Sequence, residues 1–237
     1  MKRIILTLLI LIITAGGVFS DDIFFPAKKG AVLLTANINE NGRIVGYNRM
    51  TIKDVRGSGG NMTVVYSMRI LDRNRKPARK SDDREYTTTI ANGVSKYRLD
   101  DVMDAYFTTR GLDYTMTAGN MNVPSNITQG SRLENTWLKI VVQVPIVGTV
   151  TAETVITNLV CTGIETVTVP AGTFEAYKVT QTSTTTTTGW GKSPIVNTGA
   201  TWYAKGIGVV KSISYDARGR LESSTELHEI QGISLAE

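Results

Sequence analysis

The sequence predicts a mainly β protein built as one large, curved antiparallel sheet, a half-barrel, with one short helix. Apolar and polar residues alternate with a period of two through most of the chain, which is typical of strands with one buried face. Short turn sequences such as Asn-Gly separate these runs, as tight hairpins favour. Threonine, valine and tyrosine fill the runs, and such residues suit a pleated, half-buried surface.

The N-terminus predicts a secretory signal peptide at residues 1–20. Lys2 and Arg3 precede an apolar run from Ile4 to Ile13, and small residues follow up to Ser20. This order matches the charged, apolar and cleavage regions of a signal peptide. The run is much shorter than the roughly 20 apolar residues that span a bilayer. We therefore expect no membrane-spanning segment after cleavage, with a retained anchor as the alternative.

Residues 21–237 then form a single antiparallel β domain. Domains of this size with all-β folds are common. No cysteine lies near the cleavage site, so lipid attachment there is not expected, and we predict a soluble protein of the periplasm or the cell exterior. The one cysteine, Cys161, sits in a strand-like run and has no partner for an internal disulfide. We interpret it as a buried structural residue.

The strand predictions follow the chain in order. The segment NMTVVYSMRIL places Met62, Val64, Tyr66, Met68 and Ile70 on one face of a strand. Hairpin turns are expected at Asn41-Gly42, at Asn92-Gly93 and at 216–219.

One segment, near 100–108, predicts a helix. Asp100 suits the N-cap, and Asp101 and Asp104 fall in the first turn, where carboxylates interact favourably with the helix dipole. Gly111 suits the end of the helix. The three aspartates could also suggest a metal site, but no calcium-loop spacing surrounds them. We therefore expect no metal.

A proline and a glycine lie close together in the segment VTVPAGTFEAYKV. They could belong either to a ligand-binding loop or to a turn between two strands. Pro170 presets φ for the second position of a β-turn and Gly172 suits the fourth. No helix follows, as a phosphate-binding loop would require. We interpret 169–172 as a turn between two strands. Gly206 and Gly208 lie within a strand pattern and predict a bulge or a sharp bend.

Threonine dominates residues 180–188. Polar residues on both faces give a strand no preferred register. We expect a solvated strand or sheet edge that ends at Gly189, and a disordered, glycosylated tract is the alternative.

The composition argues against several functions. The formal net charge of the whole chain is +5, and the one basic cluster, at 72–84, is interleaved with aspartate, so nucleic-acid binding is not expected. One histidine, His228, and one cysteine cannot supply a zinc site or a nucleophile with its base. We expect no catalytic residues, no metal and no cofactor. A hydrolase that uses two facing carboxylates is the least favoured alternative.

The large aromatic side chains are the candidate ligand-binding residues. They would fill the core of the curved sheet, since aromatics dominate core burial, or line a concave apolar cleft. Trp190, in a Gly-Trp-Gly triplet where the threonine run ends, is the best candidate for an exposed contact residue. The candidates are Trp137, Phe174, Trp190, Trp202 and Tyr203.

Several segments resemble a known group of proteins. VPAGTFEAYKV, TWYAKGIGVVKS, FFPAKKGAVLLTANINENGRIVGY and NVPSNITQGSRLENTWLKI are similar to segments of uncharacterised exported bacterial proteins of the Bacteroidetes type, the TapB-like and related domain-of-unknown-function chains. The resemblance covers most of residues 24–230. It implies a half-barrel similar to the lipoprotein carriers of the LolA/LolB type, and it implies no catalytic residues.

These observations lead to two main functional hypotheses. The first is a non-enzymatic envelope protein that binds or carries a lipid, a lipoprotein or an apolar peptide in the concave face of its sheet. The alternative is a structural or adhesion module with a solid core.

Overall fold

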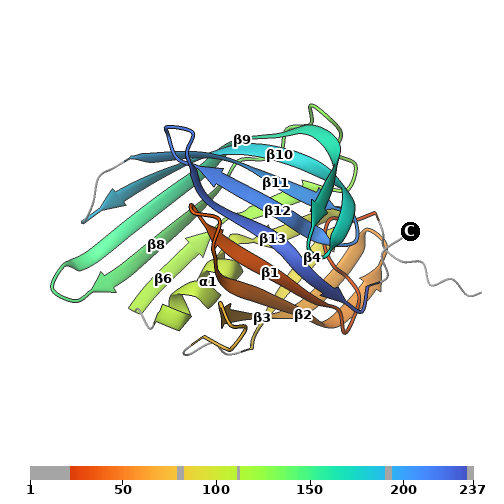
Figure 1. Ribbon diagram of the computed structural model, residues 1–237, viewed down its shortest axis with the longest axis horizontal. Coiled ribbons are helices and arrows are strands. Elements are labelled where there is room, and N and C mark those ends of the chain that lie inside the picture. Colours follow the sequence, from red (N-terminus) through yellow and green to blue (C-terminus); the bar gives the residue numbers. More distant parts are fainter. Residues whose placement is uncertain (1–21, 79–82, 111–112, 190–193, 234–237) are drawn as a thin grey trace, which may run out of the picture.

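The computed structural model describes residues 22–78, 83–110, 113–189 and 194–233. Thirteen strands and one helix make up this part of the chain (Figure 1). They are β1 (Val32–Asn39), β2 (Ile44–Ser58), β3 (Asn61–Asp72), β4 (Arg84–Ala91), β5 (Val94–Arg98), α1 (Leu99–Arg110), β6 (Asp113–Ala118), β7 (Asn120–Pro124), β8 (Thr136–Val144), β9 (Gly148–Val169), β10 (Gly172–Thr188), β11 (Ile195–Ala204), β12 (Gly208–Tyr215) and β13 (Leu221–Gln231).

All thirteen strands form one antiparallel sheet that nearly closes into a barrel. The order across the sheet is β6-β8-β9-β10-β11-β12-β13-β1-β2-β3-β4-β5-β7. The two strands at its ends, β6 and β7, are consecutive in the chain and are joined by Gly119. β6 pairs with β8, whereas β7 pairs with β5. One bent segment thus links the two ends of the sheet, and the predicted half-barrel is more closed than expected.

Gly119 makes this bend possible because the backbone approaches β8 closely. Its N–H donates to the carbonyl of Trp137 over 2.9 Å. A Cβ atom at this position would lie 2.8 Å from the Thr136 Oγ1 atom. Only glycine therefore fits without displacing a neighbour.

The N-terminal segment fills one end of the barrel, which we call the closed end. Ile23, Phe24 and Phe25 are buried there. The N–H of Gly206, in the turn between β11 and β12, donates to the carbonyl of Ile23 over 2.7 Å. The opposite end, which we call the mouth, holds the β1–β2, β8–β9 and β12–β13 turns, at the left of Figure 1. We call this buried N-terminal segment, Ile23 to Phe25, the plug.

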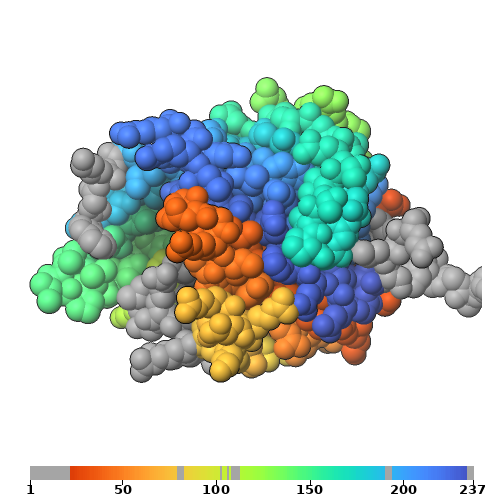
Figure 2. All heavy atoms as spheres, in the orientation of Figure 1, coloured from red at the N-terminus to blue at the C-terminus, as the bar shows by residue number. Residues whose placement is uncertain are grey.

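The segment around Pro170 forms the turn between β9 and β10. Val169 pairs with Gly172 across Pro170 and Ala171, so the segment is the predicted turn. The Ala171 N–H donates to the carbonyl of Leu227 in β13 over 3.1 Å. The tip of the hairpin thus folds back over the outside of the sheet, where Figure 2 shows it covering β13.

Most local predictions agree with the structure. Asn92 and Gly93 both have positive φ and join β4 to β5, as an Asn-Gly hairpin turn requires. The predicted helix is present and extends over Leu99–Arg110. Residues 180–188 belong to β10, which pairs on both sides and is not a sheet edge.

One prediction needs correction. Gly206 and Gly208 do not interrupt a strand, because they lie in the turn that ends β11 and begins β12, and both have positive φ. The irregularity of the ladder is instead a register shift between Trp202 and Tyr203. Alternating apolar residues continue across this tight turn, which is why the sequence pattern did not reveal it.

Candidate functional site

The inner face of the sheet can be identified from contacts across the barrel. Tyr203 of β11 and Tyr97 of β5 are far apart in the strand order, yet their ring centroids are 5.6 Å apart. The face that carries Tyr203 therefore points into the barrel. Directly paired residues share a face and side chains alternate along a strand, so the pairing register assigns the remaining inner positions.

Aromatic rings close the inside of the barrel at the plugged end. Phe24 lies against Tyr203 at 6.3 Å between ring centroids, and Phe25 lies 5.7 Å from Tyr66 and 5.5 Å from Tyr97. Burial raises the pKa of Tyr97 well above its ordinary value. These rings pack together as the floor of the barrel.

Toward the mouth, one side of the inner face is polar, and we call it the polar wall. It carries hydroxyl and amide side chains on six consecutive strands of the sheet. Most of them are half-buried, so they line space that solvent reaches. The polar wall consists of Asn37, Asn48, Gln181, Ser183, Thr185, Asn197, Thr201, Ser212, Ser214, Ser223 and Thr225.

The other side of the mouth is apolar, and we call it the apolar wall. Its side chains come from β6, β8 and β9, and the register places them on the same inner face as Ser183 and Thr185. Ile140 and Val150 are buried and the rest are half-buried. Figure 2 shows the surface hollowed beside the β8–β9 hairpin at this end. The apolar wall consists of Tyr114, Met116, Leu138, Ile140, Val142, Val150 and Ile156.

Helix α1 lies between β4 and β6, and one of its carboxylates accepts hydrogen bonds from both strands. Asp104 accepts hydrogen bonds from Arg84 at 2.8 Å and Tyr86 at 3.0 Å, both in β4, and from Tyr114 of β6 at 2.5 Å. Burial acts to raise the pKa of Asp104, but these three hydrogen bonds outweigh it and lower the pKa. We call this arrangement the Asp104 clasp.

A second helix carboxylate, Asp101, is almost fully buried. It accepts a hydrogen bond from the Tyr66 hydroxyl at 2.7 Å and lies 3.2 Å from the Arg98 guanidinium. Burial raises its pKa to about 6, against the opposing effects of Tyr66 and Arg98. Such shifts occur at functional sites and in structural networks alike. Here both partners of Asp101 anchor α1 to the sheet, so the residue has a structural reason to be buried.

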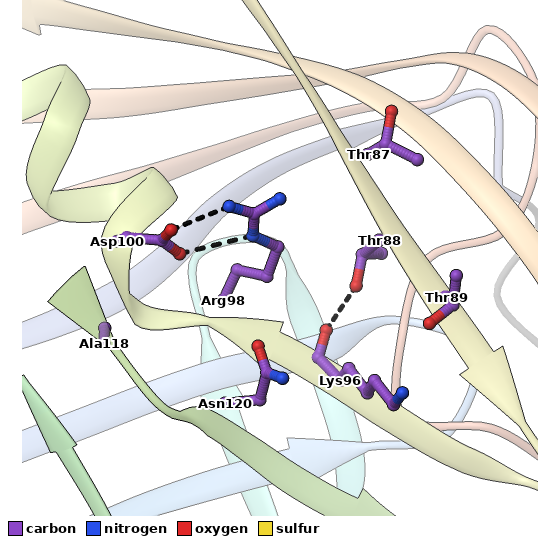
Figure 3. Close-up of a pocket in the computed structure, with 8 residues that line it drawn as sticks. All are labelled: Thr87, Thr88, Thr89, Lys96, Arg98, Asp100, Ala118 and Asn120. Atoms are coloured by element: carbon purple, nitrogen blue, oxygen red, sulfur yellow. Dashed lines mark hydrogen bonds and ion pairs between the residues drawn. The ribbon is translucent and has the colours of Figure 1, made fainter.

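A polar pocket of about 380 Å³ opens where β4 and β5 diverge. The two strands pair only at Ile90 and Ala91, and beyond that point the Thr88 hydroxyl donates to the Lys96 carbonyl (Figure 3). Arg98 points toward Asp100, with a 2.7 Å ion pair. Because Asp100 neutralises the charge of Arg98, the pocket is less suited to bind an anion. The lining is Thr87, Thr88, Thr89, Lys96, Arg98, Asp100, Ala118 and Asn120.

The structure does not bring the five candidate aromatics together. Tyr203 lies on the inner face, in the floor, with its hydroxyl 2.9 Å from the Met121 sulfur. Trp202 points to the outer face, where its Nε1–H donates to Glu165 over 2.6 Å. Phe174 belongs to the same buried cluster as Trp202.

Neither of the remaining two candidates, Trp137 and Trp190, is placed on the inner surface of the mouth. Trp137 is 47% exposed on the outer face of β8, since its neighbours Thr136 and Leu138 point inward. Trp190 lies outside the described residues. Sequence reasoning missed the polar wall, although the threonine run that contributes to it was noticed. The sequence signal that could have revealed the polar wall is the run of polar residues at 180–188, which puts hydroxyl groups on the inner as well as the outer face of β10.

The described residues hold no group of three or more histidine, cysteine or acidic side chains placed to bind a metal ion. Within the same ranges, no helix has the length and apolar character that crossing a membrane requires. Cys161 is buried, as predicted, and burial raises the pKa of its thiol. His228 packs edge-on against the Tyr47 ring at 5.6 Å.

The fold and the two-sided mouth define a class of single-sheet, nearly closed barrels with one plugged end. The chain belongs to the DUF3108-like family, whose sequence profile matches residues 28–227. This match confirms the prediction of a domain-of-unknown-function family, while the likeness to TapB-like proteins and LolA/LolB carriers stays a prediction. No curated protein matches the chain in sequence.

Two solved structures share the fold. One is a protein from Bacteroides fragilis that is inferred to be exported and has a YmcC-like fold, with a TM-score of 0.71 and 22% identity over 88% of this chain and 99% of that one. The other is a protein from Parabacteroides distasonis that is inferred to be a lipoprotein, with a TM-score of 0.73 and 19% identity over 88% of this chain and 98% of that one.

Proposed function

We propose that this protein is a non-enzymatic binding protein of the bacterial envelope that takes an amphiphile into its mouth. The observation that carries the proposal is the division of the inner surface into a polar wall and an apolar wall that face the same half-open space. An apolar chain loses contact with water against one side, while a polar headgroup keeps hydrogen bonds on the other. The names of the two similar structures agree with an envelope location.

The composition of the two walls supports binding over catalysis. Neutral hydroxyls and amides dominate the polar wall, and such groups orient a ligand without acting as strong acids or bases. The two carboxylates of α1 with shifted pKa values, Asp101 and Asp104, have their hydrogen bonds within the α1 anchor. We therefore propose a role for them in holding the helix and none in a reaction.

The decisive experiment is native mass spectrometry of the protein purified from its own host, followed by titration with a fluorescent fatty acid. We expect a retained mass in the range of a lipid and saturable binding of the probe. A bare protein mass together with no binding of the probe would remove the proposal and leave the structural or adhesion module with a solid core.

A pair of variants locates the binding surface. Leu138→Gln places a polar group on the apolar wall and is expected to weaken probe binding up to about ten-fold, since a ligand would cover the exposed part of this half-buried leucine, worth roughly half of the 1.5–3 kcal/mol for full burial. Val155→Gln is the matched control, because Val155 lies on the outer face of neighbouring β9 and is 47% exposed. Equal loss of binding in both variants would place the ligand elsewhere.

A further inference from the structure

The polar wall has unused hydrogen-bond acceptors. The Gln181 Oε1 and Asn197 Oδ1 atoms are buried and have no hydrogen-bond partner. Their residues lie on adjacent strands, because Gln181 pairs with Gly199 and Ser183 pairs with Asn197. A buried acceptor without a hydrogen-bond partner is energetically unfavourable. A donor brought by a ligand, reached after a small rotation of either amide, would recover part of that energy.

A carboxylate beside Asn197 adds further acceptor positions. The Glu222 carboxylate accepts from the Asn197 side-chain N–H at 2.5 Å and from the Ser214 hydroxyl at 3.2 Å. It retains lone pairs for further donors, since a carboxylate has about four acceptor positions. Unfilled acceptor positions thus gather at this place on the polar wall, beside amide and hydroxyl groups that can also donate.

Cationic side chains are absent from the polar wall as defined above. The basic residues of β10 and β12 point outward: Lys178 stacks over the Trp202 ring at 5.0 Å, and Lys211 pairs with Glu226 at 2.9 Å on the outer face. A phosphate or carboxylate headgroup would therefore lose its hydration without gaining a counter-charge, and Glu222 would repel it.

We infer that the amphiphile taken into the mouth carries an uncharged, hydroxyl-rich headgroup, such as a sugar, that donates hydrogen bonds to Gln181, Asn197 and Glu222. This inference rests on the proposed function, because it uses the apolar wall for the ligand's chain. A sugar supplies several O–H donors at once and loses less hydration energy than an ion when it leaves water.

The test compares three detergents that share a dodecyl chain: dodecyl maltoside, dodecyl phosphate and dodecyltrimethylammonium. Each is titrated below its critical micelle concentration and followed by calorimetry and native mass spectrometry. We expect the maltoside to bind at least about ten-fold more tightly than either charged detergent. The variant Gln181→Ala/Asn197→Ala is expected to lose this preference, with its affinity for the maltoside falling to about the level of the charged detergents. Thr184→Ala, on the outer face of β10, is the matched control and keeps the preference.

The outcomes separate the two proposals. Equal binding of all three detergents, with all three weakened to the same extent in Leu138→Gln, would overturn the headgroup inference and leave the amphiphile-binding function standing. Tighter binding of either charged detergent would also overturn the inference. No binding of any detergent to the folded protein would overturn both.

Discussion

The closed end and the mouth are made from the same thirteen-stranded sheet but from different side chains. At the closed end, the inner face carries aromatic and aliphatic residues that meet the N-terminal plug and are buried. Toward the mouth, the same strands carry serine, threonine, asparagine and glutamine on that face. The difference indicates that stability comes mainly from one end, which leaves the other end free to bind.

The largest expected effect comes from the plug. Phe24→Ala removes a ring with no exposed surface, and truncations of this kind cost about 3–5 kcal/mol of unfolding free energy. Denaturant unfolding measures the loss. Leu138→Ala in the apolar wall is the comparison, and we expect it to cost much less because Leu138 is only half-buried. Similar losses at both positions would contradict the division into a stabilising end and a binding end.

The next effect in size concerns the Asp104 clasp. Asp104→Asn removes the charge that accepts from Arg84, Tyr86 and Tyr114, and hydrogen bonds to charged groups contribute about 1.5–3 kcal/mol. We expect lower stability and faster amide hydrogen exchange in α1. Because the pKa of Asp104 is lowered, its contribution is present above pH 3.8 and is lost as pH falls through the native pKa. Unchanged exchange in α1 would show that apolar packing holds the helix.

Asp101 has the opposite dependence on pH, and its effect is smaller. Its pKa rises from the ordinary 3.8 to about 6 on folding, so the folded state takes up a proton more readily. Its contribution to stability is therefore largest at low pH and decreases as pH rises from about 4 to 6. For Asp101→Asn, the unfolding free energy relative to the parent protein should be higher at pH 7 than at pH 5. Asp100→Asn, at the half-buried position beside it, serves as control, and the same trend in both would contradict the assignment.

The smallest effect is expected in the polar wall. Ser212 and Thr225 share a hydrogen bond of 2.8 Å between their side chains. Replacing both partners with apolar groups of similar shape is nearly neutral, so Ser212→Ala/Thr225→Val should change the unfolding free energy by less than about 1 kcal/mol. A larger loss in denaturant unfolding would mean that the polar wall also supports the fold.

The sequence by itself determined the local structure, because alternation and turn chemistry act between near neighbours. Period-two patterning, the Asn92-Gly93 turn, the Pro170 turn and the aspartates that begin α1 each led to an element that the structure contains. Cys161 followed from composition in the same way, since a single thiol in an apolar run is best accommodated by burial.

The tertiary structure alone decided which faces meet. Adjacent residues Trp202 and Tyr203 point to opposite sides of the sheet, so two aromatics that look equivalent in sequence end in an outer cluster and an inner floor. The closure through Gly119 depends on pairings between β5 and β7 and between β6 and β8, and distant register cannot be read from a local pattern. The polar wall was hidden for the same physical reason: its members come from six strands, and only the curvature of the sheet brings them around one space.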